Sequence, residues 1–216
     1  KAIKEEIIQK NPYEKADKGE FSKRVASKRY SLSLEQLRSM ECLTFAEPDQ
    51  HLEQSKDMFL FSCYTGLRFS DVHALQKEMF SIKDNEMYLE METQKTRDYV
   101  NLDLHQLFLG KPKQIIEKYW HKDFEQIFRN TYNQKVNKHL KRIEKLARLD
   151  LNFPLQFHTA RHTFATLGIH ILNMSFGVLQ DYMAHKKPDT TRIYTKNTPA
   201  VRKKSREQIN WNVLNF

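Results

Sequence analysis

Several residues in the last third of the chain have the types and spacing that phosphoryl transfer requires. His158 and Arg161 are three residues apart, and they share a face if this stretch is helical. Such a face would combine an imidazole that moves protons with a guanidinium that binds two phosphate oxygens. Tyr194 follows His185 by nine residues, and Pro188 predicts that a short helix carrying the tyrosine begins near it. Histidine, arginine, histidine and tyrosine in this order indicate phosphoryl transfer with a tyrosine nucleophile.

Two upstream segments could add positive charge to a phosphate site. In TGLRFSD, Arg68 follows a glycine turn and Asp71 lies three residues later, so within a helix the carboxylate could hold the arginine in place. The alternative is a surface ion pair worth under about 1 kcal/mol. In TQKTRDY, Lys95 lies at a predicted hairpin tip, where a lysine is usually a solvated charge. Neither segment alone indicates catalysis.

The composition is that of a basic globular protein. The 216 residues include 36 Lys+Arg and 27 Asp+Glu, which gives a net charge of +9. This excess favours a polyanionic partner, most simply nucleic acid, and a merely basic soluble protein is the alternative. Cys42 and Cys63 are the only cysteines and lie outside any CxxC or His/Cys cluster, which favours a reducing cytoplasm and argues against structural zinc. No apolar run approaches the roughly 18 residues of a membrane span.

Hydrophobic periodicity predicts a mostly helical domain with a small antiparallel sheet inserted early. Alternating apolar and polar residues at 80–104 predict two or three strands, with turns at Asp84-Asn85 and at 94–97. Helices are predicted at residues 33–44, 52–64 and 67–76, from about 112 onward, at 132–149 and 158–166, in a short segment downstream, and at 199–209.

The first thirty residues differ in character from the rest of the chain. Residues 1–12 are typical of the last turns of a helix that Asn11-Pro12 ends, which suggests the end of a preceding, truncated domain. A flexible native terminus is the alternative. Residues 13–30 have the charge and polarity of a linker. We therefore expect residues 31–216 to form one compact domain with a C-terminal tail.

Taken together, four motifs resemble the catalytic domain of the tyrosine recombinase, or phage-type integrase, family. They are TGLRFSD, the QKT hairpin, HTARHTFAT and MAHKKPDTTRIYTK, and they span most of residues 31–200. KAIKEEIIQKNPY is similar to the end of the family's core-binding domain. The resemblance implies an α+β fold, mainly helical with a small antiparallel sheet, of the DNA breaking-rejoining enzyme type. It also implies a site-specific recombinase of a bacterial mobile element.

The resemblance assigns three residues to the proton transfers of the reaction. Tyr194 would attack a DNA phosphate and form a 3′-phosphotyrosyl bond. Its phenol, with a reference pKa near about 10, is protonated at neutral pH and needs a base. His158 would be that base, and Lys95 would protonate the departing 5′-oxygen.

The remaining catalytic residues implied by the resemblance act on the phosphate. Arg68 and Arg161 would bind the non-bridging oxygens and stabilise the transition state, and His185 would hydrogen-bond the phosphate. Asp71 stands where the family more often has glutamate, and HTAR and MAH replace the more frequent HxLR and LGH. Further contacts to the DNA backbone, with solvated charge as the alternative, are predicted for Arg97, Lys186, Lys187 and Arg192.

The remaining predictions concern neighbouring side chains and partners. We expect His162 to pack within the domain rather than to bind a metal with His158, and Phe164, Leu167 and Ile171 to form a buried helix face. The resemblance implies no metal and no nucleotide cofactor. It implies double-stranded DNA at a specific recombination site as the partner, and a homotetramer on DNA with a monomer in its absence. It also implies a cytoplasmic, nucleoid-associated protein without membrane contact.

Two other functions are compatible with these motifs. A type IB topoisomerase-like enzyme uses similar chemistry without exchanging strands between partners. A recombinase-derived module that only binds DNA would not need the tyrosine. For a chain with one domain of a two-domain clamp, we expect weak, salt-sensitive DNA affinity. The apolar tail after Tyr194 could pack on its own domain or on a neighbouring copy.

Overall fold

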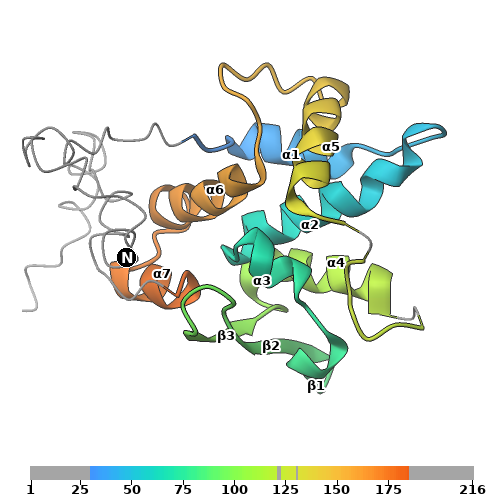
Figure 1. The fold of residues 1–216 in the computed structure, drawn as a ribbon. Helices are drawn as coiled ribbons and strands as arrows, with labels where there is room; N and C mark the ends of the chain where they lie inside the picture. The colour runs from blue at the N-terminus through green and yellow to red at the C-terminus, as the bar shows by residue number, and fades with distance from the viewer. Residues whose placement is uncertain (1–29, 121–122, 130, 185–216) are drawn as a thin grey trace, which may run out of the picture.

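The computed structural model describes residues 30–120, 123–129 and 131–184, and in these ranges it has a mostly helical fold with one small sheet (Figure 1). The α-helices are α1 (Leu34–Cys42), α2 (Glu53–Thr65), α3 (Phe69–His73), α4 (Lys111–Trp120), α5 (Asn133–Leu146), α6 (Phe157–His170) and α7 (Phe176–Tyr182). The strands are β1 (Phe80–Lys83), β2 (Glu86–Glu92) and β3 (Tyr99–Asp103). Short 3₁₀ helices are η1 (Asp49–Leu52), η2 (Lys77–Met79) and η3 (Leu107–Gly110).

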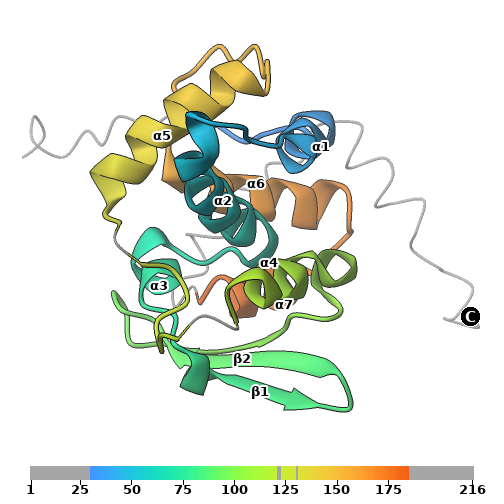
Figure 2. The same cartoon turned by 90° about the vertical axis from the view of Figure 1, so that its right-hand side faces the viewer.

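Helix α2 forms the centre of the core. Eleven of its 13 residues are buried, and it contacts α1, α3, α4, α5 and α6, which surround it (Figure 2). In a helix that is buried on all sides, each side chain must be either apolar or hydrogen-bonded to a partner. Its buried polar groups are accordingly bonded, as in the hydrogen bond of 2.6 Å from Ser62 to the Leu67 carbonyl. Gly66 ends the helix in the left-handed conformation with φ of +74°, as the Thr65-Gly66 pair predicts.

The three strands form an antiparallel sheet in the order β1-β2-β3. Phe80 pairs with Leu89, and Leu89 pairs with Leu102, so one face of the sheet carries apolar side chains toward the helices. Asp84 and Asn85 both have positive φ in the two-residue turn between β1 and β2, a conformation that these two residue types tolerate. The predicted sheet and its first turn are confirmed.

Helix α6 contacts the first described residues of the chain. Thr163, buried on α6, accepts a hydrogen bond of 2.9 Å from the Leu32 amide, and Tyr30 stacks on Phe153 with ring centroids 4.4 Å apart. Phe164 and Leu167 are buried as predicted. The prediction for Ile171 was wrong: it is 53% exposed, because the helix ends at His170 and its periodicity stops there. Within the described ranges no helix combines the length and apolar character of a membrane span.

Candidate active site

A cavity of about 370 Å³ brings together four of the six residues that the resemblance implies for catalysis. Arg68 comes from the start of α3, Lys95 from the β2–β3 turn, and His158 and Arg161 from the first turns of α6. Segments separated by about 90 residues of sequence therefore meet at one hollow. The rest of the lining consists of Leu67, Phe69, Ser70, Asn133, Asn137, Gln156 and Phe157.

Arg68 supplies a guanidinium suited to an anion. Its backbone is extended (φ −75°, ψ 162°), so it precedes the first turn of α3 as the N-cap residue. Its Nη1 atom is buried and has no hydrogen-bond partner among the described residues. Buried polar groups normally find a partner, and a guanidinium nitrogen facing a hollow would obtain one from a phosphate oxygen.

Asp71 connects the two cationic segments through their backbones. Its fully buried carboxylate accepts a hydrogen bond of 3.2 Å from the Arg68 amide and one of 2.8 Å from the Gln94 amide. The sequence predicted that this carboxylate would hold Arg68. The structure shows that it does so through the backbone N–H, and that it also holds the residue next to Lys95.

The turn that carries Lys95 is fixed by its own backbone. Thr93 is 1% exposed, and its amide donates to the Asp98 carbonyl at 2.9 Å. The Thr93 carbonyl in turn accepts from the Arg97 amide at 3.0 Å. The side chain of Lys95 is exposed and reaches the cavity from this fixed loop. The ammonium group of Lys95 therefore reaches the cavity from a backbone that is held in place.

Arg161 closes the cavity from the opposite side. It is 3% exposed, and its guanidinium donates hydrogen bonds to the carbonyls of Gly66 and Met183. The first carbonyl ends α2 and the second follows α7, so the arginine satisfies acceptors that the helices leave free. It also fixes the end of α7 next to the cavity, directly before the chain continues to His185.

His158 lies at the rim and is exposed. Its ring contacts that of His162 edge to face, with centroids 4.4 Å apart, and His162 itself is half-buried. The cavity also receives the N-terminal ends of α5 and α6, since Asn133 is the first residue of α5 and Phe157 the first of α6. Helix N-termini attract anions through their free amides and dipole. The cationic side chains and the two helix N-termini thus both contribute positive electrostatic potential to the cavity.

Comparison with known proteins agrees with this geometry. Residues 32–200 match the sequence profile described as the Phage integrase family, which covers most of the chain. The chain belongs to this family. A comparison with curated protein sequences found no match.

Solved structures similar to the integrase chain are tyrosine recombinases. A lambda integrase dimer bound to a COC′ core site has a TM-score of 0.67 and 20% identity, covering 92% of this chain and 69% of that one. XerH site-specific recombinase bound to difH substrate has a TM-score of 0.62 and 17% identity, covering 86% and 56%. The Tn1549 transposon integrase in complex with circular intermediate DNA has a TM-score of 0.62 and 18% identity, and the match covers 96% of this chain and 74% of that one. At these identities the likeness shows the fold of the catalytic domain, and the chain spans between about half and three quarters of each relative.

Of the other predicted site residues of this integrase-family chain, the described ranges include Arg97. Arg97 is exposed on the same turn as Lys95, with φ of +54°, but does not line the hollow. The rest lie outside the described residues: His185, Lys186, Lys187, Arg192 and Tyr194. Among the described residues, no group of three or more His, Cys, Asp or Glu side chains could hold a metal ion.

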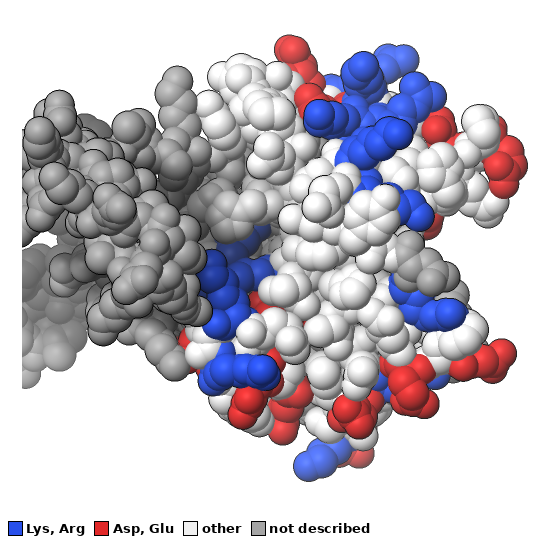
Figure 3. All heavy atoms as spheres, viewed as in Figure 1, with Lys and Arg blue, Asp and Glu red and all other residues white. Residues whose placement is uncertain are grey.

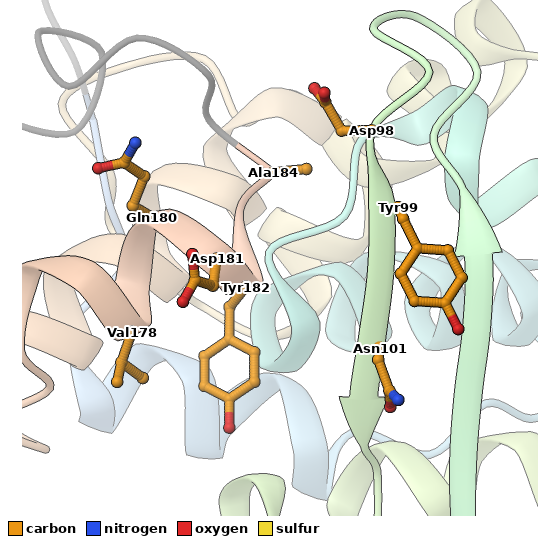
Figure 4. A pocket seen from close by; sticks show the side chains of 8 residues that line it. All are labelled: Asp98, Tyr99, Asn101, Val178, Gln180, Asp181, Tyr182 and Ala184. Atoms are coloured by element: carbon orange, nitrogen blue, oxygen red, sulfur yellow. The ribbon is translucent and has the colours of Figure 1, made fainter.

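A second cavity, of about 530 Å³, lies between β3 and α7 (Figure 4). Among the described residues, its lining includes the carboxylates of Asp98 and Asp181 and contains no lysine or arginine. Burial and then the charge of Asp103 raise the pKa of Tyr182, so its phenol stays protonated at neutral pH. The acidic lining makes this cavity unsuitable for a phosphate.

Ser70 and three further polar residues of the catalytic-domain cavity were not predicted from the sequence. Asn133 and Asn137 are on α5, and Gln156 precedes α6. The only available signal was their position on the polar side of an amphipathic helix or before a helix start. That position is also typical of ordinary solvated residues.

Proposed function

We propose that this protein is a site-specific DNA recombinase that cuts and rejoins DNA through Tyr194 during integration or excision of a mobile element. The observation that carries the proposal is the convergence of Arg68, Lys95, His158 and Arg161 on one cavity. An orphaned, buried Nη1 atom of Arg68 in that cavity supports an anionic substrate. Family membership supports the reaction class.

In the proposed reaction, Tyr194 Oη attacks the scissile phosphorus and loses its proton to His158. The bond between phosphorus and the 5′-oxygen breaks as the 3′-phosphotyrosyl bond forms, and Lys95 protonates the departing oxygen. Arg68 and Arg161 stabilise the added charge on the non-bridging oxygens. Religation is the reverse, with the 5′-hydroxyl of a partner strand as nucleophile. Bond energy is kept in the enzyme–DNA link, so the cycle is balanced without a nucleotide cofactor.

The position of Met183 supports a role for His185 in this reaction. The Met183 carbonyl accepts from Arg161, and Ala184, two residues after Tyr182, is the last described residue. His185 therefore follows directly on a segment bonded to a cavity residue. We propose that it donates a hydrogen bond to the phosphate and that Tyr194 reaches the same cavity from the segment after it.

DNA outside the site is proposed to run along α5. Its exposed cations are Lys135, Lys138, Lys141, Arg142 and Lys145. Figure 3 shows lysine and arginine side chains gathered over the part of the molecule that α5 occupies in Figure 1. Because α5 begins at the cavity, a phosphate backbone held by this row leads to the site. We propose phosphate contacts for Arg97, Lys186, Lys187 and Arg192 as well.

We propose the domain organisation from the sequence pattern and from the family to which the chain belongs. Residues 1–12 would end a core-binding domain, residues 13–30 would be a linker, and residues 31–216 would be the catalytic domain with its tail. The full protein would act as a homotetramer on DNA. The solved relatives include a lambda integrase tetramer bound to a Holliday junction.

The test is covalent capture on DNA. Full-length protein is incubated with a duplex that carries its recombination site and a nick that prevents religation, and a protease-sensitive adduct is measured. We expect an adduct from wild type and from Tyr182→Phe, a matched change outside the cavity, and none from Tyr194→Phe. No adduct from wild type on an authenticated site would favour a module that only binds DNA. Relaxation of any supercoiled plasmid without a paired site would favour the topoisomerase-like function.

A further inference from the structure

Asn137 links α5 to the first turn of α6. Its side-chain Oδ1 accepts a hydrogen bond of 2.7 Å from the amide of Phe157, the residue before His158. Its Nδ2 donates to Asn133 Oδ1 at 3.1 Å. Asn137 is half-buried and lines the cavity that holds the catalytic candidates. One carboxamide thus satisfies a free amide at the start of α6, which would otherwise need water or a ligand.

A second side chain of α5 contacts the same segment. Glu144, seven residues after Asn137, accepts from the Leu155 amide at 3.4 Å, so both acceptors lie on the face of α5 that meets α6. The shorter bond is the one from Asn137, and it is the one adjacent to His158. Two side chains of α5 therefore hold the entry into α6, in addition to the bond of 2.9 Å from the Thr159 amide to the Gln156 carbonyl within its first turn.

The cavity has two walls that are held by different residues. Asp71 holds the wall with Arg68 and Lys95, by bonds to the amides of Arg68 and Gln94. His158 and Arg161 lie on the other wall, which begins at the amide that Asn137 holds. The distance between an acid on one wall and a base on the other depends on both anchors.

We propose that Asn137 is a positioning residue, which sets the first turn of α6 and thereby the place of His158 relative to the scissile phosphate. This inference rests on the proposed function. Asn137 does not touch the reacting atoms in the proposed reaction. Displacement of a reacting group by about 1 Å can reduce a rate by about 100-fold, so loss of this anchor has a measurable effect on cleavage.

The experiment compares full-length variants in single-turnover cleavage of the nicked site at saturating DNA. Asn137→Ala removes the acceptor, and Asn137→Ser keeps a polar group that is too short to reach the Phe157 amide. Asn137→Asp keeps the acceptor oxygen, and Gln134→Ala, a change of an exposed α5 side chain outside the cavity lining, is the control. Hydrogen exchange of the Phe157 amide reports the contact itself and needs no activity. DNA affinity is measured in parallel.

We expect Asn137→Ala and Asn137→Ser to cleave at least about tenfold more slowly, with DNA affinity within about twofold of wild type and faster exchange at Phe157. Asn137→Asp should restore slow exchange and recover most of the rate, while its added charge weakens DNA affinity. Gln134→Ala should match wild type in rate and exchange.

Three results would overturn the proposal. One is a wild-type cleavage rate in Asn137→Ala despite faster exchange at Phe157. Another is an equal loss in Gln134→Ala and Asn137→Ala, which would indicate a general effect of changes at the start of α5. The third is slow exchange in Asn137→Asp without any recovery of rate. Absence of cleavage by wild type would instead count against the proposed function, and the exchange data would still show whether Asn137 holds α6.

Discussion

Replacement of Asp71 should impair both the fold and the protonation of the leaving group. Its carboxylate is fully buried and accepts from two backbone amides, at 3.2 Å for Arg68 and 2.8 Å for Gln94. One amide belongs to Arg68 itself, and the other belongs to Gln94, the residue before Lys95. Asp71→Ala removes both bonds at once, so the β2–β3 turn loses its tie to α3.

The size of the effect follows from the two bonds. A hydrogen bond to a charged group contributes about 1.5–3 kcal/mol, and a buried donor left without a partner costs about 1–3 kcal/mol. Asp71→Ala should therefore lower the free energy of unfolding by about 3–5 kcal/mol, a large share of the roughly 5–15 kcal/mol of a typical domain. Asp71→Asn keeps one oxygen, which should stay with the shorter bond to Gln94 and lose only the cap on α3, at about 1 kcal/mol.

The assay separates the structural loss from the catalytic one. Free energies of unfolding come from denaturant titration, and cleavage is measured on substrates with a 5′-bridging oxygen or a 5′-bridging sulfur at the scissile phosphate. A thiol with a pKa near about 8.5 leaves without prior protonation, so the sulfur substrate does not need Lys95. We expect Asp71→Ala to lose about 100-fold or more on oxygen and much less on sulfur, because general acid catalysis contributes roughly 10²–10⁴-fold. An equal loss on both substrates would refute the coupling between Asp71 and Lys95.

Two further changes test the packing and the charges of the core. Gly66→Ala should destabilise the fold by about 2 kcal/mol or more, because φ is +74° and a Cβ would lie 2.6 Å from Phe164 Cδ1. Gly177→Ala, which meets no atom within 4 Å, is the control and should be neutral or stabilising in denaturant unfolding. Burial raises the pKa of Asp57 above 3.8, against the opposing charge of Lys118. The folded state therefore binds this proton more tightly, and the stabilisation that Asp57 provides at low pH decreases as pH rises through the raised pKa. In titrations between about pH 3.5 and 7, wild type should lose stability relative to Asp57→Asn as pH rises, and a constant difference would contradict the shift.

The sequence was sufficient for the elements whose signals are local. The Ser33 capping box, the Thr65-Gly66 helix end and the Asp84-Asn85 turn depend on neighbouring residues, and all three are present in the structure. The helix predicted at residues 132–149 is likewise present as α5, and its apolar residues Val136 and Leu140 are buried. A local pattern can be recognised in the sequence because the residues that form it are at most a few positions apart.

The contacts that position the site could not be predicted in the same way. The partners of Arg161 are the carbonyls of Gly66 and Met183, and the partner of Asn137 is the amide of Phe157. Every residue has these backbone groups, so no residue type marks the partner. The wrong prediction for Ile171 has a related cause, because the end of α6 at His170 depends on the following turn and not on apolar spacing.

Dependence on backbone partners explains how a site of this kind can persist in distant sequences. Asp71, Arg161 and Asn137 hold amides and carbonyls, and these groups remain when the side chains around them change. Only the anchoring and reacting side chains must then be retained, together with helices that begin and end at the same places. The similar recombinase structures share 14–21% identity with this chain and have a similar fold. The geometry of the cavity depends on where α2, α3, α6 and α7 begin and end, so in the cleavage assay a change that shifts a helix terminus should reduce the rate more than a change on an exposed helix face.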